Sequence, residues 1–171
     1  NIFLGQATGE DITTGTDNTF IGDNAGANTT DADYNTAVGS SSLVINTTGA
    51  SNTAVGYGAL DANTTADANT GVGYNALTEN STGTNNVAVG SSPLAANSTG
   101  ASNTALGFKA LEANTTASNN TAVGANALLL NTTGTDNVAV GSNAGDAVST
   151  GSDNTFVGDN AGGAITTSSF N

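Results

Sequence analysis

An aliphatic residue followed directly by glycine recurs every 17 residues along the whole chain. Ten such glycines run from Gly5 to Gly158, and an asparagine stands four residues before each of them. The period has no gap and no insertion, and its consensus reads N-T-A-V-G-x-N-A-L-x-x-N-T-T-G-x-x. Residues 1–171 are therefore a single repeat array of ten 17-residue units.

A unit of this length is too short for two helices and the turn between them. It suits one coil of a parallel β-solenoid, with two or three short strands joined by glycine and asparagine turns. In such a stack each residue lies about 4.8 Å from its equivalent in the next coil. The sequence predicts an all-β fold of ten coils, in which the turn glycines include Gly39, Gly56, Gly73, Gly90, Gly107, Gly124 and Gly141.

Two positions of the repeat exchange volume, which locates the interior of the coil. In three repeats the residue two before the column glycine is Phe and the residue four after it is Gly, as in Phe20 and Gly26; Ala139 with Gly145, both small, is the one exception to the exchange. The earlier residue is small where the later residue is Leu, as in Ala54 and Leu60. Large and small side chains trade places in this way inside one close-packed core.

The aliphatic residue before each glycine must then point out of the coil, because successive side chains of a strand alternate between its faces. We call these residues the Val column: Leu4, Ile21, Val38, Val55, Val72, Val89, Leu106, Val123, Val140 and Val157. A soluble monomer rarely leaves such a long apolar stripe in water. We expect other copies of the chain to cover it, in a homotrimer or a filament.

The composition excludes several classes of function. One basic residue against 14 acidic ones gives a net charge of −13, which disfavours nucleic acid and anionic membranes as partners. The chain has no Cys and no His, so it lacks thiolate ligands, the commonest metal ligand and the usual general base. No apolar run reaches the ~20 residues of a membrane span.

Acidic columns such as Asp17, Asp136 and Asp153 are interrupted in most repeats, which favours a solvated acidic face over a calcium site. The expectation is a chain that is not an enzyme and has no catalytic residues, no cofactor and no metal.

Six asparagines at one register are also N-x-S/T sequons: Asn46, Asn63, Asn80, Asn97, Asn114 and Asn131. They predict either a row of N-glycans or an asparagine ladder bonded amide to amide. The ladder is favoured because Ile and Val occupy the same column in outer repeats, and because glycans on successive coils would crowd at about 4.8 Å.

Threonines form a further column, nine residues after the column glycine: Thr14, Thr48, Thr65, Thr82, Thr99, Thr116, Thr133, Thr150 and Thr167. We call it the Thr column. A regular threonine array can resemble an ice-binding surface. The favoured alternative is a set of turn hydroxyls bonded to the backbone or to each other.

The repeat itself resembles a known family. The segments N-T-A-V-G at 35–39, 52–56 and 120–124, and N-V-A-V-G at 86–90 and 137–141, resemble the head repeats of trimeric autotransporter adhesins of the YadA type. The longer unit at 103–117 is similar to repeats of phage-type tail fibres that end in a self-cleaving chaperone domain. The resemblance spans the whole chain. It implies a left-handed parallel β-roll in a homotrimer used for attachment, with the Val column toward the trimer axis.

The sequence thus predicts a shaft or head segment of an extracellular fibre on a cell or virion surface, cut from a longer protein. Its expected partners are further copies of itself and a host-surface glycan or protein receptor. One alternative is the subunit of a self-assembling filament, with or without N-glycans. The other is an ice- or surface-binding solenoid.

Overall fold

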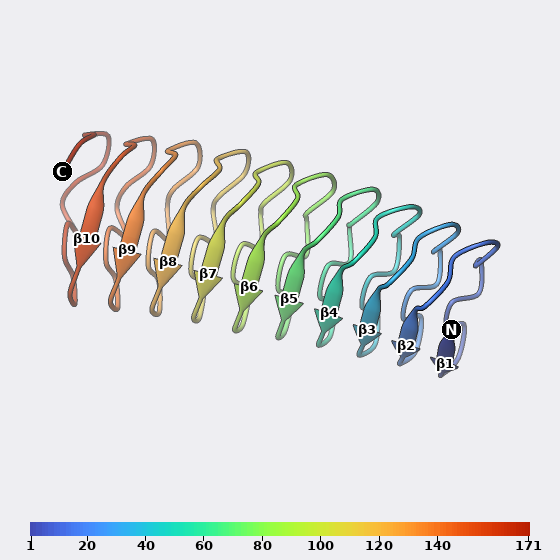
Figure 1. Cartoon of the computed structure of the whole chain (residues 1–171). Helices are drawn as coiled ribbons and strands as arrows, with labels where there is room; N and C mark the ends of the chain where they lie inside the picture. Colours follow the sequence, from blue (N-terminus) through green and yellow to red (C-terminus); the bar gives the residue numbers. More distant parts are fainter.

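The computed structural model describes all 171 residues as one rod of stacked coils, with the two termini at opposite ends (Figure 1). Ten strands pair in parallel, in sequence order, as one sheet along the rod. They are β1 (Ile2–Leu4), β2 (Thr19–Ile21), β3 (Thr36–Val38), β4 (Thr53–Val55), β5 (Thr70–Val72), β6 (Val87–Val89), β7 (Thr104–Leu106), β8 (Thr121–Val123), β9 (Val138–Val140) and β10 (Thr155–Val157). Paired residues are 17 positions apart, as in Val38 and Val55, so the predicted all-β parallel solenoid is confirmed.

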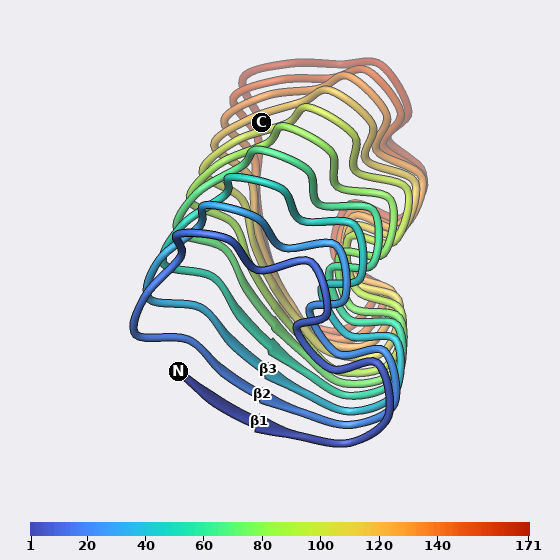
Figure 2. The ribbon, with the colours of Figure 1, turned by 90° about the vertical axis from the view of Figure 1, so that its right-hand side faces the viewer.

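Each coil contains one three-residue strand rather than the two or three expected. The reason is that three positions in every coil adopt the left-handed backbone conformation, which no extended strand accommodates. In the coil that contains Gly90 these are Ser92 (φ 56°), Leu94 (φ 49°) and Ser102 (φ 58°). The coil therefore has an outline that bends inward on one side (Figure 2). The turns still bond coil to coil, since the Leu94 amide donates to the Ala110 carbonyl at 3.0 Å.

A narrow column of Ala and Leu, with Phe near both ends, forms the core of the rod. The strand-centre residue and the leucine four after the glycine are fully buried, as Leu60 illustrates. In the outer coils a Phe ring takes the volume of the absent leucine, because a Cβ atom added at Gly26 would collide with the Phe20 ring. Phe156 also fills the preceding coil, where a Cβ atom at Gly145 would lie 2.7 Å from its ring. The predicted exchange of volume is confirmed.

Six core leucines combine complete burial with a left-handed backbone, at φ between 49° and 55°: Leu43, Leu60, Leu77, Leu94, Leu111 and Leu128. The left-handed conformation costs roughly 1–2 kcal/mol for an L-residue other than glycine. Burying the leucine side chain contributes about 1.5–3 kcal/mol. Burial outweighs the strain, and glycine, which has no such strain, replaces leucine where a Phe ring already fills the space.

Candidate functional site

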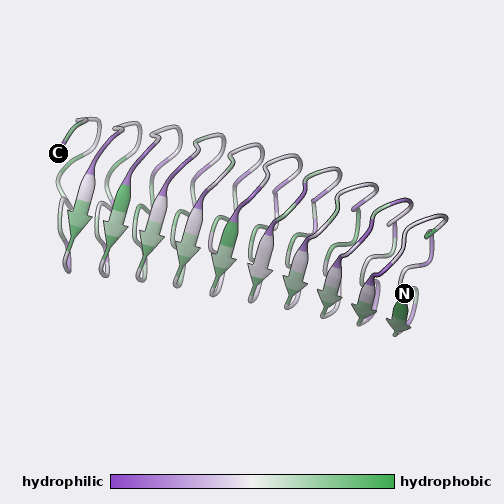
Figure 3. Ribbon diagram, in the orientation of Figure 1, coloured by the Kyte–Doolittle hydropathy of each residue, from purple (hydrophilic) through white to green (hydrophobic).

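The Val column lies on the outer face of the sheet. In every strand from β2 to β10 the middle residue is buried, while the side chains on either side of it face outward. Val89 and Leu106 are each 37% exposed although the column continues above and below them. Hydrophobic colour accordingly follows the strand ends along the whole rod (Figure 3). The column is a continuous apolar ribbon, bordered on the same face by the Thr or Val that opens most strands.

The turn glycine after each strand allows two backbones to approach closely. The seven predicted turn glycines have φ between 131° and 140°, outside the range that other residues favour. A Cβ atom on Gly90 would lie 2.5 Å from the carbonyl oxygen of Gly107 in the next coil. The Gly107 amide donates to the Val89 carbonyl at 2.8 Å, which holds the two coils at this spacing. These glycines therefore set the coil spacing beside the Val column.

The asparagines four residues before the glycine join the start of each strand to the next coil. Asn52 is fully buried, and its Oδ1 accepts a hydrogen bond from the Asn69 amide at 2.9 Å. Its Nδ2 donates to the Ala66 carbonyl at 2.8 Å. One side chain thus bonds two separate backbone segments of the neighbouring coil, at Ala66 and at Asn69, and asparagine occupies this position in all ten repeats.

The six sequon asparagines form a second, fully buried ladder, in which every amide nitrogen after that of Asn46 donates to the preceding asparagine, toward the N-terminal end of the rod. Asn97 Nδ2 donates to Asn80 Oδ1 at 2.7 Å and to the Gly100 carbonyl at 2.9 Å. These nitrogens are hydrogen-bonded inside the coil and offer no attachment point for a glycan in the folded chain. At the C-terminal end Val148 follows in the column, and the Asn131 Oδ1 atom has no partner.

The Thr column lies on the surface of the rod, and its residues from Thr48 to Thr150 are exposed. Their hydroxyls do not make the hydrogen bonds that the sequence suggested for them, and only Thr14 bonds a side chain, that of Asp31. The preceding residue in each repeat makes the backbone bonds instead, as when Thr64 Oγ1 donates to the Ser81 carbonyl at 3.1 Å. The Thr column is therefore a row of hydroxyls open to solvent.

Two carboxyl groups have displaced pKa values for opposite reasons. Hydrogen bonds from Thr13 and Thr14, at 2.6 and 2.9 Å, hold the pKa of Asp31 below its ordinary range. Burial raises the pKa of Asp61. No group of three or more acidic side chains converges in a way that could hold a metal ion, and the surface has no pocket. None of the chain forms a helix long and apolar enough to cross a membrane.

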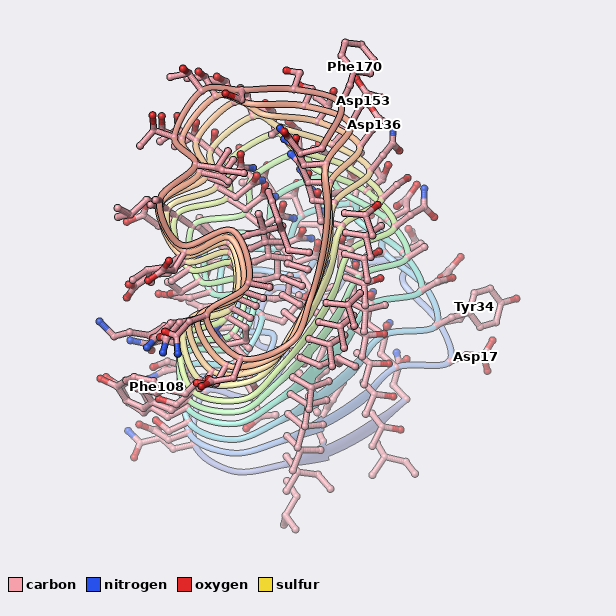
Figure 4. All side chains as sticks on the ribbon, turned by 90° about the vertical axis from the view of Figure 1, so that its left-hand side faces the viewer. Asp17, Tyr34, Phe108, Asp136, Asp153 and Phe170 are labelled. Carbon is pink, nitrogen blue, oxygen red and sulfur yellow. The ribbon has the colours of Figure 1, made fainter.

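An exposed aromatic column, which the sequence analysis overlooked, occupies the position directly after the turn glycine. Tyr57, Tyr74 and Phe108 are 56%, 55% and 50% exposed. Phe108 projects from the side of the coil opposite Tyr34 (Figure 4). Lys109, the one cation among the side chains, lies 5.6 Å from the centre of the Phe108 ring. The separations of 17 and 34 residues were visible in the sequence and could have revealed this column.

No protein family, curated protein or solved structure was found to match the chain. The likeness to adhesin and tail-fibre repeats therefore remains a resemblance of the repeat unit itself.

Proposed function

We propose that this chain is a structural shaft or head segment of an extracellular fibre that mediates attachment, and that it works as a homotrimer around the Val column. The observation that carries the proposal is the uninterrupted aliphatic ribbon on the outer face of a ten-strand sheet. A closed ring of three copies would bury this ribbon equally on every chain, whereas an open arrangement would keep growing.

Burial of the Val column between copies of the chain would favour association. Full burial of such a side chain contributes roughly 1.5–3 kcal/mol, and about a third of that remains available where a third of the side chain is exposed, as at Val89. Ten positions then supply about 5–10 kcal/mol per chain. The opposing term is charge, since three chains carry 3 × −13 = −39. No acidic residue lies in the Val column, and salt screens the charges of the exposed carboxylates within ~10 Å.

Light scattering in solution tests the assembly directly. We expect a mass close to three times the 16.4 kDa of the chain. The substitution Val89→Asp places three carboxylates at the axis and should dissociate the trimer. The matched control is Thr99→Asp, which adds the same charge in the exposed Thr column and should leave the mass unchanged. A well-folded monomer with the native sequence would refute the proposal.

A glycosylated filament has less support, because all six sequon asparagines of the ladder are buried and hydrogen-bonded. Of the sequons outside the ladder, Asn28 and Asn119 are exposed. If the chain carries N-glycans, they belong at those two positions, which an intact mass before and after glycosidase treatment would show.

Ice or surface binding is a second candidate function, favoured by the open hydroxyls of the Thr column. The test is thermal hysteresis of a solution of the chain. Substituting Thr82 and Thr99 together by Lys should abolish any hysteresis while leaving the oligomeric mass unchanged, since neither residue lies in the Val column.

A further inference from the structure

The aromatic column has a geometry that a merely solvated surface does not require. The Tyr57 and Tyr74 rings stack with centroids 5.7 Å apart and an angle of 11° between their planes. Because the two residues occupy successive coils, their ring faces look along the rod rather than away from it. Both outer faces of the pair are uncovered, since the neighbouring coils carry small serines, Ser40 and Ser91, at the same position.

Ser91 opens a gap one coil deep between two aromatic residues. Tyr74 and Phe108 lie two coils apart, which corresponds to about 9.6 Å along the rod. Carbon atoms in van der Waals contact are separated by about 3.5–4 Å, so two such contacts take up roughly 7–8 Å. The surface has no enclosed pocket here, but this spacing between two exposed aromatic residues is wide enough for one ring-shaped group at the position of Ser91.

The aromatic column is local, which distinguishes it from a self-association surface. The Val column is aliphatic in all ten coils, as a face shared between aligned rods must be. The position after the turn glycine is aromatic in only three coils and is Gln, Asp, Ser or Ala in the others. A second parallel copy would therefore find no continuous surface there, whereas a small ligand would need only one segment of the rod.

We propose that Tyr57, Tyr74 and Phe108 form a binding site for the sugar rings of a neutral glycan, with one pyranose ring held in the gap above Ser91. Pyranose rings present C–H faces of slight positive charge, which aromatic faces of negative charge attract. Their hydroxyl groups remain at the rim of the gap, where polar partners lie. This inference rests on the proposed attachment role and specifies the class of receptor that such a segment would bind.

The rim of the gap supplies groups that can orient sugar hydroxyls. Ser91 and Asn75 each present side-chain polar atoms that make no hydrogen bond within the chain, and both are half-buried. Beside the Phe108 ring, Lys109 Nζ pairs with Glu112 Oε1 at 3.1 Å, and the pair provides both a donor and an acceptor. The net charge of −13 repels sulfated or sialylated glycans, which is why the expected ligand is neutral.

Binding to an array of printed oligosaccharides tests the site. The probes are neutral hexose and N-acetylhexosamine oligomers, with sialylated oligomers as the charge control. We expect retention of at least one neutral oligomer and of none of the sialylated ones. Titration of the retained oligomer, followed by intrinsic tyrosine fluorescence, then measures the affinity of each variant.

Three variants separate binding from folding. Ser91→Tyr fills the gap and continues the stack, so it should weaken binding at least tenfold without lowering the melting temperature. Tyr74→Ala removes one wall and should weaken binding by a similar factor. Tyr34→Ala removes an exposed tyrosine on the opposite side and should leave binding unchanged.

The inference is overturned if no neutral oligomer is retained, if Ser91→Tyr binds as well as the native chain, or if Tyr34→Ala weakens binding as much as Tyr74→Ala. Light scattering on the same samples keeps the two proposals apart. A trimer without glycan binding overturns only this inference, and a monomer overturns the assembly itself.

Discussion

The exchange of volume between Phe and Leu predicts that the core of one coil type can be rebuilt as the other. We consider Leu94→Gly combined with Ala88→Phe, which gives the sixth coil the pair found at Phe20 and Gly26. Removing the fully buried Leu94 side chain costs roughly 2–5 kcal/mol. Relief of its left-handed backbone, at φ 49°, returns about 1–2 kcal/mol. Ala88→Phe alone overpacks the core and costs about 1–3 kcal/mol.

If the two positions share one interior, the double variant should be more stable than the sum of the single changes by about 1–3 kcal/mol. Urea unfolding followed by circular dichroism measures each free energy, provided that the transition remains cooperative. The matched control pairs Ala88→Phe with Leu111→Gly, one coil further on. Phe156 fills its own coil and the preceding one, so a Phe at position 88 should not reach a gap in the following coil. Equal coupling in both pairs, or none in either, would refute the account of the core.

Three other substitutions test the turns, the ladder and the charge. Gly90→Val should lower the free energy of unfolding by at least ~2 kcal/mol, because its side chain meets the next carbonyl oxygen, while Ser92→Ala should change it by less than ~0.5 kcal/mol. Asn97→Val leaves Asn80 Oδ1 without a donor and so adds one unpaired buried acceptor, whereas Asn131→Val unpairs Asn114 Oδ1 but removes Asn131 Oδ1, which already has no partner. Asn97→Val should therefore cost about 1–3 kcal/mol more than Asn131→Val, and equal costs in urea unfolding would contradict the ladder. Burial raises the pKa of Asp61, so the ionised form of this side chain opposes folding as pH rises. Asp61→Asn should therefore raise the melting temperature near pH ~7 and not near pH ~3, and a gain of equal size in acid would contradict this.

The sequence was sufficient to predict the coils, their register and the buried face of the strands. The strict period of 17 residues reports the coils and the register, and the exchange of volume between Phe and Leu reports the buried face. The turns were harder to foresee. Leu94 and its five equivalents sit in a backbone conformation that leucine rarely adopts, and only the gain from their burial makes it stable. The expectation of two or three strands per coil rested on the length of the unit, which does not show that these positions form tight turns.

The hydroxyls were misassigned for a related reason. Thr64 and Thr65 are neighbours in sequence, yet the first donates to a backbone carbonyl and the second faces solvent. A period shows that two columns exist, but it does not show which way a side chain in an irregular turn points. Exposure of Tyr57 and Tyr74 is likewise set by the path of the turn around the column glycine rather than by their own residue type.

The ladders also explain why variation is confined to particular columns of this rod. An inserted residue would shift the strand pairing, the strand-start asparagines and the sequon asparagines of that coil at once, because all three join residues 17 positions apart. Each shift would leave buried polar groups unpaired, at about 1–3 kcal/mol per group. Substitution is far less costly where a side chain faces solvent and bonds to no other coil. The position after the turn glycine meets that condition and varies from Asp to Tyr among the repeats. In a fold whose backbone is fixed by its ladders, specific recognition must therefore be encoded in the outward columns, and a cluster of three aromatic residues in one of them marks the place to look for it.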